Sequence, residues 1–337
     1  MYLDVLKHWS AFKIDALGLV TLLGVEAVDR AVGRLVQNPF TDWLPLMGAY
    51  TIASDQVVEP TPGFTLYNIT DAILAADLTG WFTRWMLTQD LAFATTTLTL
   101  VTTSPPNHHR PSRRWILPFT IGILIVSALI ILSILIEDWW ALVAGLSMGV
   151  SVVVRQIILG QNRWAIDRAV AMTRNEPDEI CKLFVTIPNG KAVTIYAPRR
   201  IIQGPLLTTP RPAYPRIYLI ARYIGWAAFG GLVISLGMAS LLCQPYSVVV
   251  LIVASTVTVR GIGDDERFIG SGLMIFSETS GDRDSRMTAY LKMQLSESEE
   301  ATMLLWSLLP QRSNVAWWET YSEVKKLYTE EFLKRGE

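Results

Sequence analysis

Cysteine, histidine and charge are all scarce in this sequence. Its 337 residues include two cysteines and three histidines, and only 18% of them are charged, whereas about a quarter of the residues in soluble domains are charged. Cys181 and Cys243 lie on separate segments without metal-ligand spacing, so neither a disulfide framework nor a cysteine metal site is expected. The net charge of −1 gives no overall attraction to nucleic acid, which is therefore not an expected partner.

Apolar side chains, by contrast, are abundant and gathered into long runs. They account for 51% of the chain, and the mean hydropathy is +0.33. Long apolar runs with few charges are typical of a polytopic α-helical membrane protein. The segments that could enter a bilayer are residues 115–136, 139–154, 223–243 and 246–259. The first has no charged residue and would be about 33 Å long as a helix, which is enough to cross the hydrocarbon layer.

Very short connectors join these segments in pairs. Residues 137–138 separate the first two segments, and residues 243–245 separate the last two. Connectors of this length allow only tight helical hairpins. The sequence therefore predicts two transmembrane helical hairpins, four spans in total, with a mixed α/β layer on the cytosolic side. It leaves open whether residues 14–25 or 89–103 form an additional span.

The expected domain organisation follows from these hairpins. Charged residues near positions 15 and 26–30 share one arc of a helical wheel, which indicates an amphipathic helix on the membrane or against another helix. The predicted parts are residues 1–105 as N-terminal cytosolic or interfacial amphipathic helices, 115–160 as the first transmembrane hairpin, 161–215 as a cytosolic loop with a β-hairpin, 216–260 as the second transmembrane hairpin, and 261–337 as a C-terminal cytosolic α/β segment.

The basic residues predict the orientation in the membrane. Neither short connector contains a lysine or arginine, whereas Arg110, Arg113 and Arg114 precede the first apolar segment. The middle loop is also rich in basic residues, namely Arg155, Arg163, Arg168, Arg174, Lys182, Lys191, Arg199, Arg200, Arg211, Arg216 and Arg222. Because basic loops stay in the cytosol, we expect both termini and the middle loop to be cytosolic.

Several segments outside the apolar runs have the pattern of β structure or of a capped helix. Residues 182–197 alternate apolar and polar side chains around Pro-Asn-Gly at 188–190, which predicts a β-hairpin. Residues 270–278 are predicted to form a further strand. Ser296 and Glu299 have the spacing of a capping box at the start of a helix. These segments are expected to form one mixed α/β layer beneath the membrane helices.

Three other segments are predicted from helical periodicity or remain ambiguous. Residues 70–88 read as an amphipathic helix that begins at Thr70-Asp71 as a cap. The threonine-rich residues 92–103 fit a strand or a helix equally well. Residues 315–334 place aromatic side chains on one face and are predicted to be the last helix.

Two arginines interrupt otherwise apolar segments, and they raise the question of a site. A long aliphatic stem lets a guanidinium reach the phosphate layer, so a membrane anchor is the simplest interpretation of Arg155 and Arg260. The chain remains apolar after Arg155 as far as Leu159, which places Arg155 about one turn deeper. We expect it to face the bundle interior and to form a small polar pocket with the middle loop, without a carboxylate nearby in the apolar segments. The candidate pocket residues are Arg155, Gln156, Gln161 and Asn162.

Two motifs resemble chemical sites but are better explained by structure. Gly145–Gly149 has the G-x-S-x-G pattern, yet no histidine follows Ser147, so a hydrolase nucleophile is not expected. Small residues four apart instead predict helix packing, with Gly145 and Gly149 against Gly231 and Ser235. The acidic residues 264–266 would share a metal only with a second cluster on the same side of the membrane, and the sequence has none. No catalytic residue, metal ligand or cofactor is predicted.

Two classes of function remain open from the sequence. The first is an integral membrane accessory or scaffold protein whose cytosolic layer binds a protein partner and whose helices contact the lipid bilayer. The second is a membrane enzyme or carrier that acts on a hydrophobic or lipid-like small molecule at the cytosolic face. The lack of a complete catalytic constellation favours the first class, and whether the chain is an enzyme is left open.

Overall fold

The computed structural model describes residues 25–335 apart from residues 48, 103–112, 174–177, 210, 241 and 282–283. The predicted N-terminal amphipathic helix lies only partly within this range, and its described part is α3 (Val25–Gly33). Residues 14–24, considered above as part of an additional span, lie outside the described residues.

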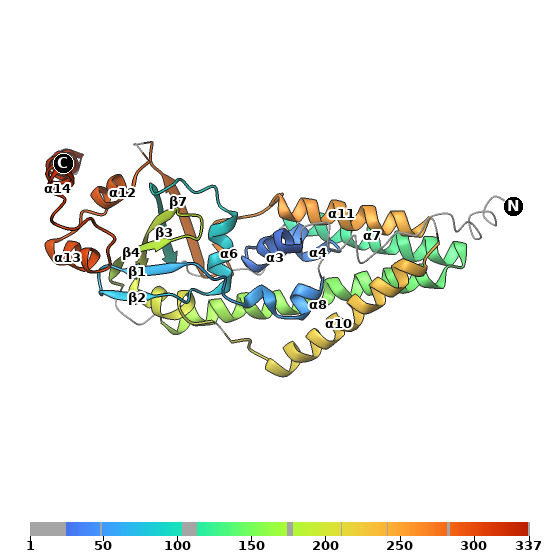
Figure 1. Ribbon diagram of the computed structural model, residues 1–337. Helices are drawn as coiled ribbons and strands as arrows, with labels where there is room; N and C mark the ends of the chain where they lie inside the picture. The colour runs from blue at the N-terminus through green and yellow to red at the C-terminus, as the bar shows by residue number, and fades with distance from the viewer. Residues whose placement is uncertain are drawn as a thin grey trace.

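A bundle of apolar helices forms one end of the molecule, and a sheet with its covering helices forms the other (Figure 1). The bundle consists of α7 (Arg113–Ile136), α8 (Trp139–Met172), α10 (Pro215–Met238) and α11 (Cys243–Val259). By length and composition, α7, α8 and α10 are candidate membrane spans, whereas α11 has 17 residues and is apolar but shorter. The structure therefore supports a membrane protein with three candidate spans.

The longest helix, α8, belongs to both ends of the molecule. Its 34 residues make it about 51 Å long, and its C-terminal part runs from the bundle to the sheet (Figure 1). There the Asp167 carboxylate accepts hydrogen bonds from the backbone N–H groups of Ser271 and Gly272, at 2.7 and 2.9 Å. Gly270 has φ +60°, and a Cβ at this position would lie 2.5 Å from the Asp167 carboxylate. This close approach fixes the sheet to α8.

The small residues of the bundle pack differently from the seam predicted above. Gly145 and Gly149 of α8 face α7, where their nearest neighbours include Ile130 and Val126. Gly231 of α10 instead faces Ser147 of α8, whose Oγ would lie 2.9 Å from an added Cβ. Side chains two positions apart in a helix differ in direction by about 200°, so Ser147 points away from Gly145 and Gly149. The two hairpins therefore meet through a different face of α8 from the one expected.

Seven strands form one mixed sheet at the other end of the molecule, in the order β2-β1-β4-β5-β3-β7-β6. The strands are β1 (Thr65–Asn68), β2 (Ile73–Ala75), β3 (Thr96–Thr102), β4 (Ile180–Thr186), β5 (Ala192–Pro198), β6 (Phe268–Ile269) and β7 (Leu273–Thr279). Among the described strands, only β3 and β5 are parallel neighbours. The strands come from before the first hairpin, from between the hairpins and from after the second, so one sheet unites all three segments.

The two faces of the sheet are covered by different helices. One face packs on α3, on α6 (Gly80–Thr88) and on α8 around a large apolar core that includes Leu98, Ile195 and Ile275. On the other face, Phe184 of β4 packs against Tyr290 within a second apolar cluster. That cluster belongs to the C-terminal helices α12 (Arg286–Lys292), α13 (Glu297–Leu305) and α14 (Val315–Arg335). A short helix α9 (Arg199–Ile201) and a π turn η2 (Ile202–Leu206) lead from β5 toward the bundle.

Several local predictions are confirmed by the structure. Strands β4 and β5 form the hairpin expected around residues 188–190, and β7 is the strand expected within 270–278. The capping box of Ser296 and Glu299 is present at the start of α13, and α14 is the expected last helix. The ambiguous residues 92–103 contain strand β3, so residues 89–103 do not form an additional membrane span.

The region 1–105 is the main correction to the sequence prediction. It was expected to contain amphipathic helices, yet it supplies β1, β2 and β3 to the sheet. The helix predicted over residues 70–88 begins only at Gly80, and β2 occupies residues 73–75. Thr70-Asp71 lies in the turn between β1 and β2, where Asp71 forms an ion pair with Arg199 instead of capping a helix. The pairing of β2 with β1 therefore prevails over the helical periodicity of residues 70–88.

Candidate functional site

An irregular segment lies among the bundle helices; it comprises residues 38–47 and 49–58, and we call it the wedge. It contains two short helices, α4 (Pro39–Trp43) and α5 (Ala49–Ala53), and a 3-10 turn η1 (Gln56–Val58). Asn38 caps α4 by accepting hydrogen bonds from the N–H groups of Phe40 and Thr41, and Pro39 occupies the first helical position, where its missing N–H has no consequence.

Arg155 of α8 binds the backbone of the wedge. Arg155 is 1% exposed, and its guanidinium donates to the carbonyl oxygens of Asp42, at 3.2 Å, and of Leu44. Gln156 donates its side-chain amide to the same Asp42 carbonyl. The Nε atom of Arg155 is buried without a hydrogen-bond partner among the described residues. Arg155 thus faces the bundle interior, but its partners are wedge carbonyls rather than groups of the middle loop.

The carboxylate of Asp42 binds a second arginine from α8. Arg163 donates to both oxygens of Asp42, at 2.8 and 3.0 Å, and also to the carbonyl oxygens of Leu35 and Val36. The Asp42 side chain is 1% exposed. Arg163 therefore binds the buried carboxylate of Asp42, whereas Arg155 is held by the dipoles of neutral backbone carbonyl groups. Such a network is costly to break because either partner alone would be a buried, unpaired charge.

The wedge also contacts α7 and α11. Trp43 packs edge-on against Phe119 of α7, with ring centroids 4.7 Å apart. A Cβ on Gly122 would collide with the Trp43 carbonyl oxygen, so glycine is required for this close approach. The Met47 N–H donates to the Ser255 hydroxyl of α11 at 3.0 Å.

The fourth bundle helix, α10, binds the end of the wedge. Arg222 donates to the carbonyl oxygens of Ala53 and Ser54, both at 2.9 Å, and forms an ion pair with Asp55 at 3.2 Å. Tyr218 donates its hydroxyl proton to Asp55 and accepts from Asn162 of α8 at 3.3 Å. The wedge therefore has polar contacts with α8, α10 and α11 and a close packing contact with α7.

Three of the four candidate pocket residues thus converge on the wedge. Arg155 and Gln156 bind it directly, and Asn162 reaches it through Tyr218. Gln161 lies apart, because its side-chain oxygen accepts from the backbone N–H of Tyr214, just before α10. A cavity beside Asn162 has a volume of about 10 Å³, which is room for about one water molecule.

The acidic residues 264–266, considered above as a metal motif, interact mainly with a neighbouring arginine. Arg34 forms ion pairs with Asp264 and with Glu266, the latter at 3.4 Å, and Asn38 donates its side-chain amide to Asp264. Within the described part of the chain, no group of three or more histidine, cysteine or acidic side chains is arranged to hold a metal ion. The two cysteines, Cys181 and Cys243, are buried free thiols.

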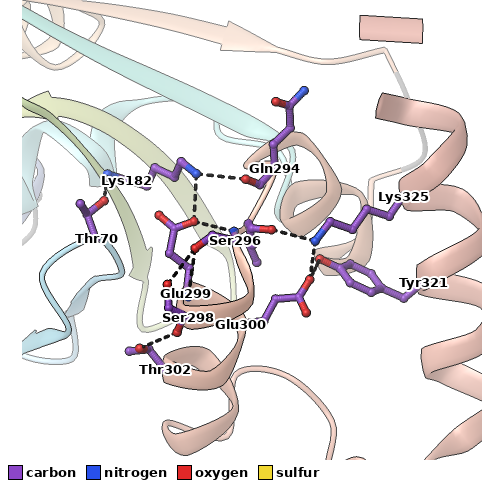
Figure 2. Close-up of polar contacts among 11 residues, drawn as sticks. Thr70, Lys182, Gln294, Ser296, Ser298, Glu299, Glu300, Thr302, Tyr321 and Lys325 are labelled. Carbon is purple, nitrogen blue, oxygen red and sulfur yellow. Dashed lines mark hydrogen bonds and ion pairs between the residues drawn. The ribbon is translucent and has the colours of Figure 1, made fainter. Parts of the chain in front are cut away.

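A separate polar network attaches α13 to the sheet. Lys182 of β4 donates to the Glu299 carboxylate and to the Gln294 carbonyl oxygen, both at 3.0 Å (Figure 2). Glu299 also accepts from the backbone N–H of Ser296, at 2.8 Å. Burial alone would raise the pKa of Glu299, but the hydrogen bonds from Ser296 and Lys182 outweigh it and lower the pKa below its ordinary value.

The adjacent Glu300 binds the last helix. It accepts hydrogen bonds from the Tyr321 hydroxyl, at 3.1 Å, and from the Lys325 ammonium group, at 2.6 Å (Figure 2). Burial and the neighbouring Glu300 raise the pKa of Tyr321 above its ordinary value, so Tyr321 remains a donor. Neighbouring glutamates of α13 thus point in different directions, one to the sheet and one to α14.

The sequence interpretation missed the partners that the wedge itself supplies. Asp42 and Asp55 were not identified, nor were Tyr218 and Arg222 as the partners of Asp55. A local signal for the short helix was present, since Asn38-Pro39 is a good cap and first-turn pair. No sequence signal linked that helix to Arg155, which is more than one hundred residues away.

The chain was also compared with known proteins. No family model, no curated protein and no solved structure matches it.

Proposed function

We propose that this protein is an integral membrane scaffold or accessory protein, with four spans and an α/β layer that binds a protein partner on the cytosolic side. The observation that carries the proposal is the use of the polar groups within the bundle. Arg155, Gln156, Arg163 and Arg222 all bind the wedge of the same chain. Through the wedge, these groups hold the bundle helices together, as a rigid membrane scaffold requires.

The composition of the sheet supports four spans. Strand β3 precedes the first hairpin, β4 and β5 lie between the hairpins, and β7 follows the second, yet all belong to one sheet. A sheet cannot continue through a bilayer, so each helical pair must return to the side from which it left. Helix α11 therefore crosses back after α10. Its 17 residues give a length of about 25 Å, and modest local thinning of the bilayer accommodates such a helix.

The cytosolic location of the sheet rests on charge. The segment between the hairpins, which contributes β4 and β5, is rich in arginine and lysine, whereas the connectors at the far end of the bundle have neither. The positive-inside rule then assigns the sheet and the C-terminal helices to the cytosol. The interfacial side chains agree, since Arg168 lies over the exposed Trp164 ring, 5.3 Å from its centroid, where α8 leaves the bundle.

Cysteine labelling tests the topology. In a variant whose native cysteines are replaced, Asn189→Cys lies in the β4–β5 turn and Trp139→Cys lies at the far end of the bundle, where Trp139 is 73% exposed. A membrane-impermeant maleimide should label Trp139→Cys in intact cells and Asn189→Cys only after the membrane is opened. Labelling of both positions from the same side would contradict the four-span arrangement.

Mass spectrometry of the purified protein tests the scaffold function against the alternative. A membrane enzyme or carrier for a lipid-like molecule would use Arg155 and its neighbours to hold that molecule, and Arg155→Lys would release it. We expect no stoichiometric co-purifying small molecule, in the parent chain or in Arg155→Lys. A bound molecule that disappears in Arg155→Lys but persists in Arg168→Lys would overturn the scaffold proposal in favour of the alternative.

A further inference from the structure

The outer edge of strand β7 is open over half of its length. Strand β6 pairs only with Leu273 and Met274 of β7. Beyond them, the Ile275 N–H points away from β3 and donates to the Arg267 carbonyl oxygen at 2.9 Å. Because backbone groups alternate in direction along a strand, the N–H and C=O of Ser277 point the same way. Ser277 is exposed, and none of the described residues pairs with its backbone on this side.

A groove of about 340 Å³ runs along this open edge. Its floor includes Ile275 and Ser277, one wall is formed by Trp85 of α6 and by Gln89, which directly follows α6, and the other wall is the loop of residues 261–267. The Trp85 indole N–H donates to the Glu266 carbonyl oxygen at 3.0 Å, which holds the two walls at a fixed separation. The groove is therefore built into the fold and does not depend on a loose loop.

A buried donor in the groove lacks an acceptor. The side-chain amide nitrogen of Gln89 is buried and has no hydrogen-bond partner among the described residues. Buried polar groups are almost always paired, so this donor marks a place where an acceptor is missing. A backbone carbonyl of an added strand would supply one.

The groove is acidic on balance, because its lining has three carboxylates, those of Asp264, Asp265 and Glu266, and one cation, Arg267. Asp264 is paired with Arg34, but Asp265 has no ion pair in the described part of the chain, and Glu266 lies 3.4 Å from Arg34. Glu278 on the open part of β7 is exposed as well. A second copy of this chain, paired edge to edge, would bring two sets of these carboxylates together, which is unfavourable. A segment that carries lysine or arginine is complementary.

We propose that the groove binds an extended basic segment of a partner protein, which adds as a strand to the open edge of β7. This inference rests on the proposed scaffold function and names the kind of partner. Strand addition obtains its affinity from main-chain hydrogen bonds and its specificity from side-chain pockets. The loop 261–267 begins directly after α11, so the groove lies next to the membrane surface. The cytosolic flanks of transmembrane helices are rich in lysine and arginine, and such a flank is the segment that fits here.

Peptide binding to the full-length protein tests this proposal. The protein is placed in nanodiscs of phosphatidylcholine, whose zwitterionic surface does not compete for a basic peptide. The probe is a fluorescent peptide of about seven residues, the length of an ordinary strand, that alternates lysine and valine. We expect saturable binding by fluorescence anisotropy, weakened by salt, and no binding of the matched peptide with glutamate in place of lysine.

Two variants separate the backbone contribution from the charge contribution. Ser277→Pro removes an N–H that points outward and should weaken binding by at least about tenfold, while Ser277→Ala keeps the N–H and should bind normally. Asp265→Lys should weaken binding by roughly threefold to tenfold, and the same charge change in Glu323→Lys, on exposed α14, should not. In the parent protein, peptide should slow hydrogen exchange at the Ser277 amide.

Three results would overturn the proposal: no binding of the basic peptide, equal binding to Ser277→Pro, or a dimer of the free protein that Ser277→Pro dissociates. The last result would make a second copy the occupant of the groove. The maleimide labelling pattern and the small-molecule content of the protein do not depend on any of these results. Failure of the groove proposal is therefore distinguishable from failure of the scaffold proposal.

Discussion

The bundle and the sheet distribute polar groups in opposite ways. In the bundle, the outer surface is apolar, and the strongest polar contacts lie inside, where Arg155 and Arg163 meet Asp42. In the sheet, the interior is apolar, and the pair of Lys182 and Glu299 lies nearer to the surface, with side chains 27% and 13% exposed. Each region thus presents to its surroundings the groups that those surroundings solvate.

This difference has an energetic consequence. Ion pairs near water are worth little, because water already solvates each partner. A buried pair is different, because the loss of one partner leaves an uncompensated charge in a medium of low polarity. The bundle should therefore be far more sensitive than the sheet to the loss of a single polar group, and the following substitutions test that expectation.

The largest effect is expected for Asp42→Asn. This change preserves the backbone carbonyl that Arg155 uses but removes the carboxylate that Arg163 binds with both of its terminal nitrogens. Breaking a buried pair costs about 3–5 kcal/mol, so the midpoint of thermal unfolding in detergent should fall strongly. The control is Glu26→Gln, which removes an exposed ion pair with Arg30. Equal midpoints for the two variants would contradict the contrast between buried and exposed pairs.

A smaller loss is expected for Gly122→Ala. The added methyl group collides with the Trp43 carbonyl oxygen and pushes α4 away from α7. Overpacking of this kind costs about 1–3 kcal/mol, measurable in the same unfolding assay. Gly230→Ala is the matched control, because a Cβ there meets no atom within 4 Å. If Gly122→Ala is as stable as Gly230→Ala, the wedge does not pack against α7 as described.

A loss of about 1 kcal/mol or less is expected for Lys182→Met in the sheet region. This variant removes the ion pair with Glu299 and the hydrogen bond to the Gln294 carbonyl oxygen, while the apolar contact of Phe184 with Tyr290 remains. Hydrogen exchange should speed up in α13 and remain unchanged in the bundle. A double-mutant cycle with Glu299→Gln isolates the pair; a coupling above about 2 kcal/mol would show that this contact behaves like a buried one.

The smallest effect is expected from the contribution of Glu299 to the pH dependence of stability. Its pKa in the folded protein lies below the ordinary value of 4.5, so the folded state binds this proton less tightly than the unfolded state. The stabilisation is therefore complete above pH 4.5 and is lost as the pH falls through the folded pKa. Below that value, the parent protein and Glu299→Gln should show the same exchange rates in α13. A difference in exchange rate that persists below the folded pKa would show that packing, and not the charge of Glu299, stabilises α13.

The sequence revealed the elements whose signals are local. The hairpin of β4 and β5 has its turn residues in place, and the capping box of α13 lies within four residues. The apolar helices α7, α8 and α10 were evident because a membrane demands long uninterrupted runs. Each of these features is decided by residues that are close together in the chain.

The features that the sequence did not reveal depend on distant partners. Strand β1 is a strand because it pairs with β4, more than one hundred residues later. Arg155 was recognised as unusual, yet its partners are carbonyl groups, and every residue has a carbonyl. No residue type marks a backbone acceptor, so a pattern of side chains cannot predict which part of the chain Arg155 binds.

The continuous helix α8 connects the bundle rigidly to the sheet, so a change in the tilt of α8 moves the sheet. Because α8 is one rod of 34 residues whose C-terminal part is tied to the sheet through Asp167, a tilt in the bilayer swings the sheet as a whole. Over a length of about 50 Å, a tilt of roughly 10° moves the far end by about 9 Å. Helix tilt responds to bilayer thickness. The lateral position of the sheet over the membrane surface is therefore coupled to the thickness of the lipid around the bundle.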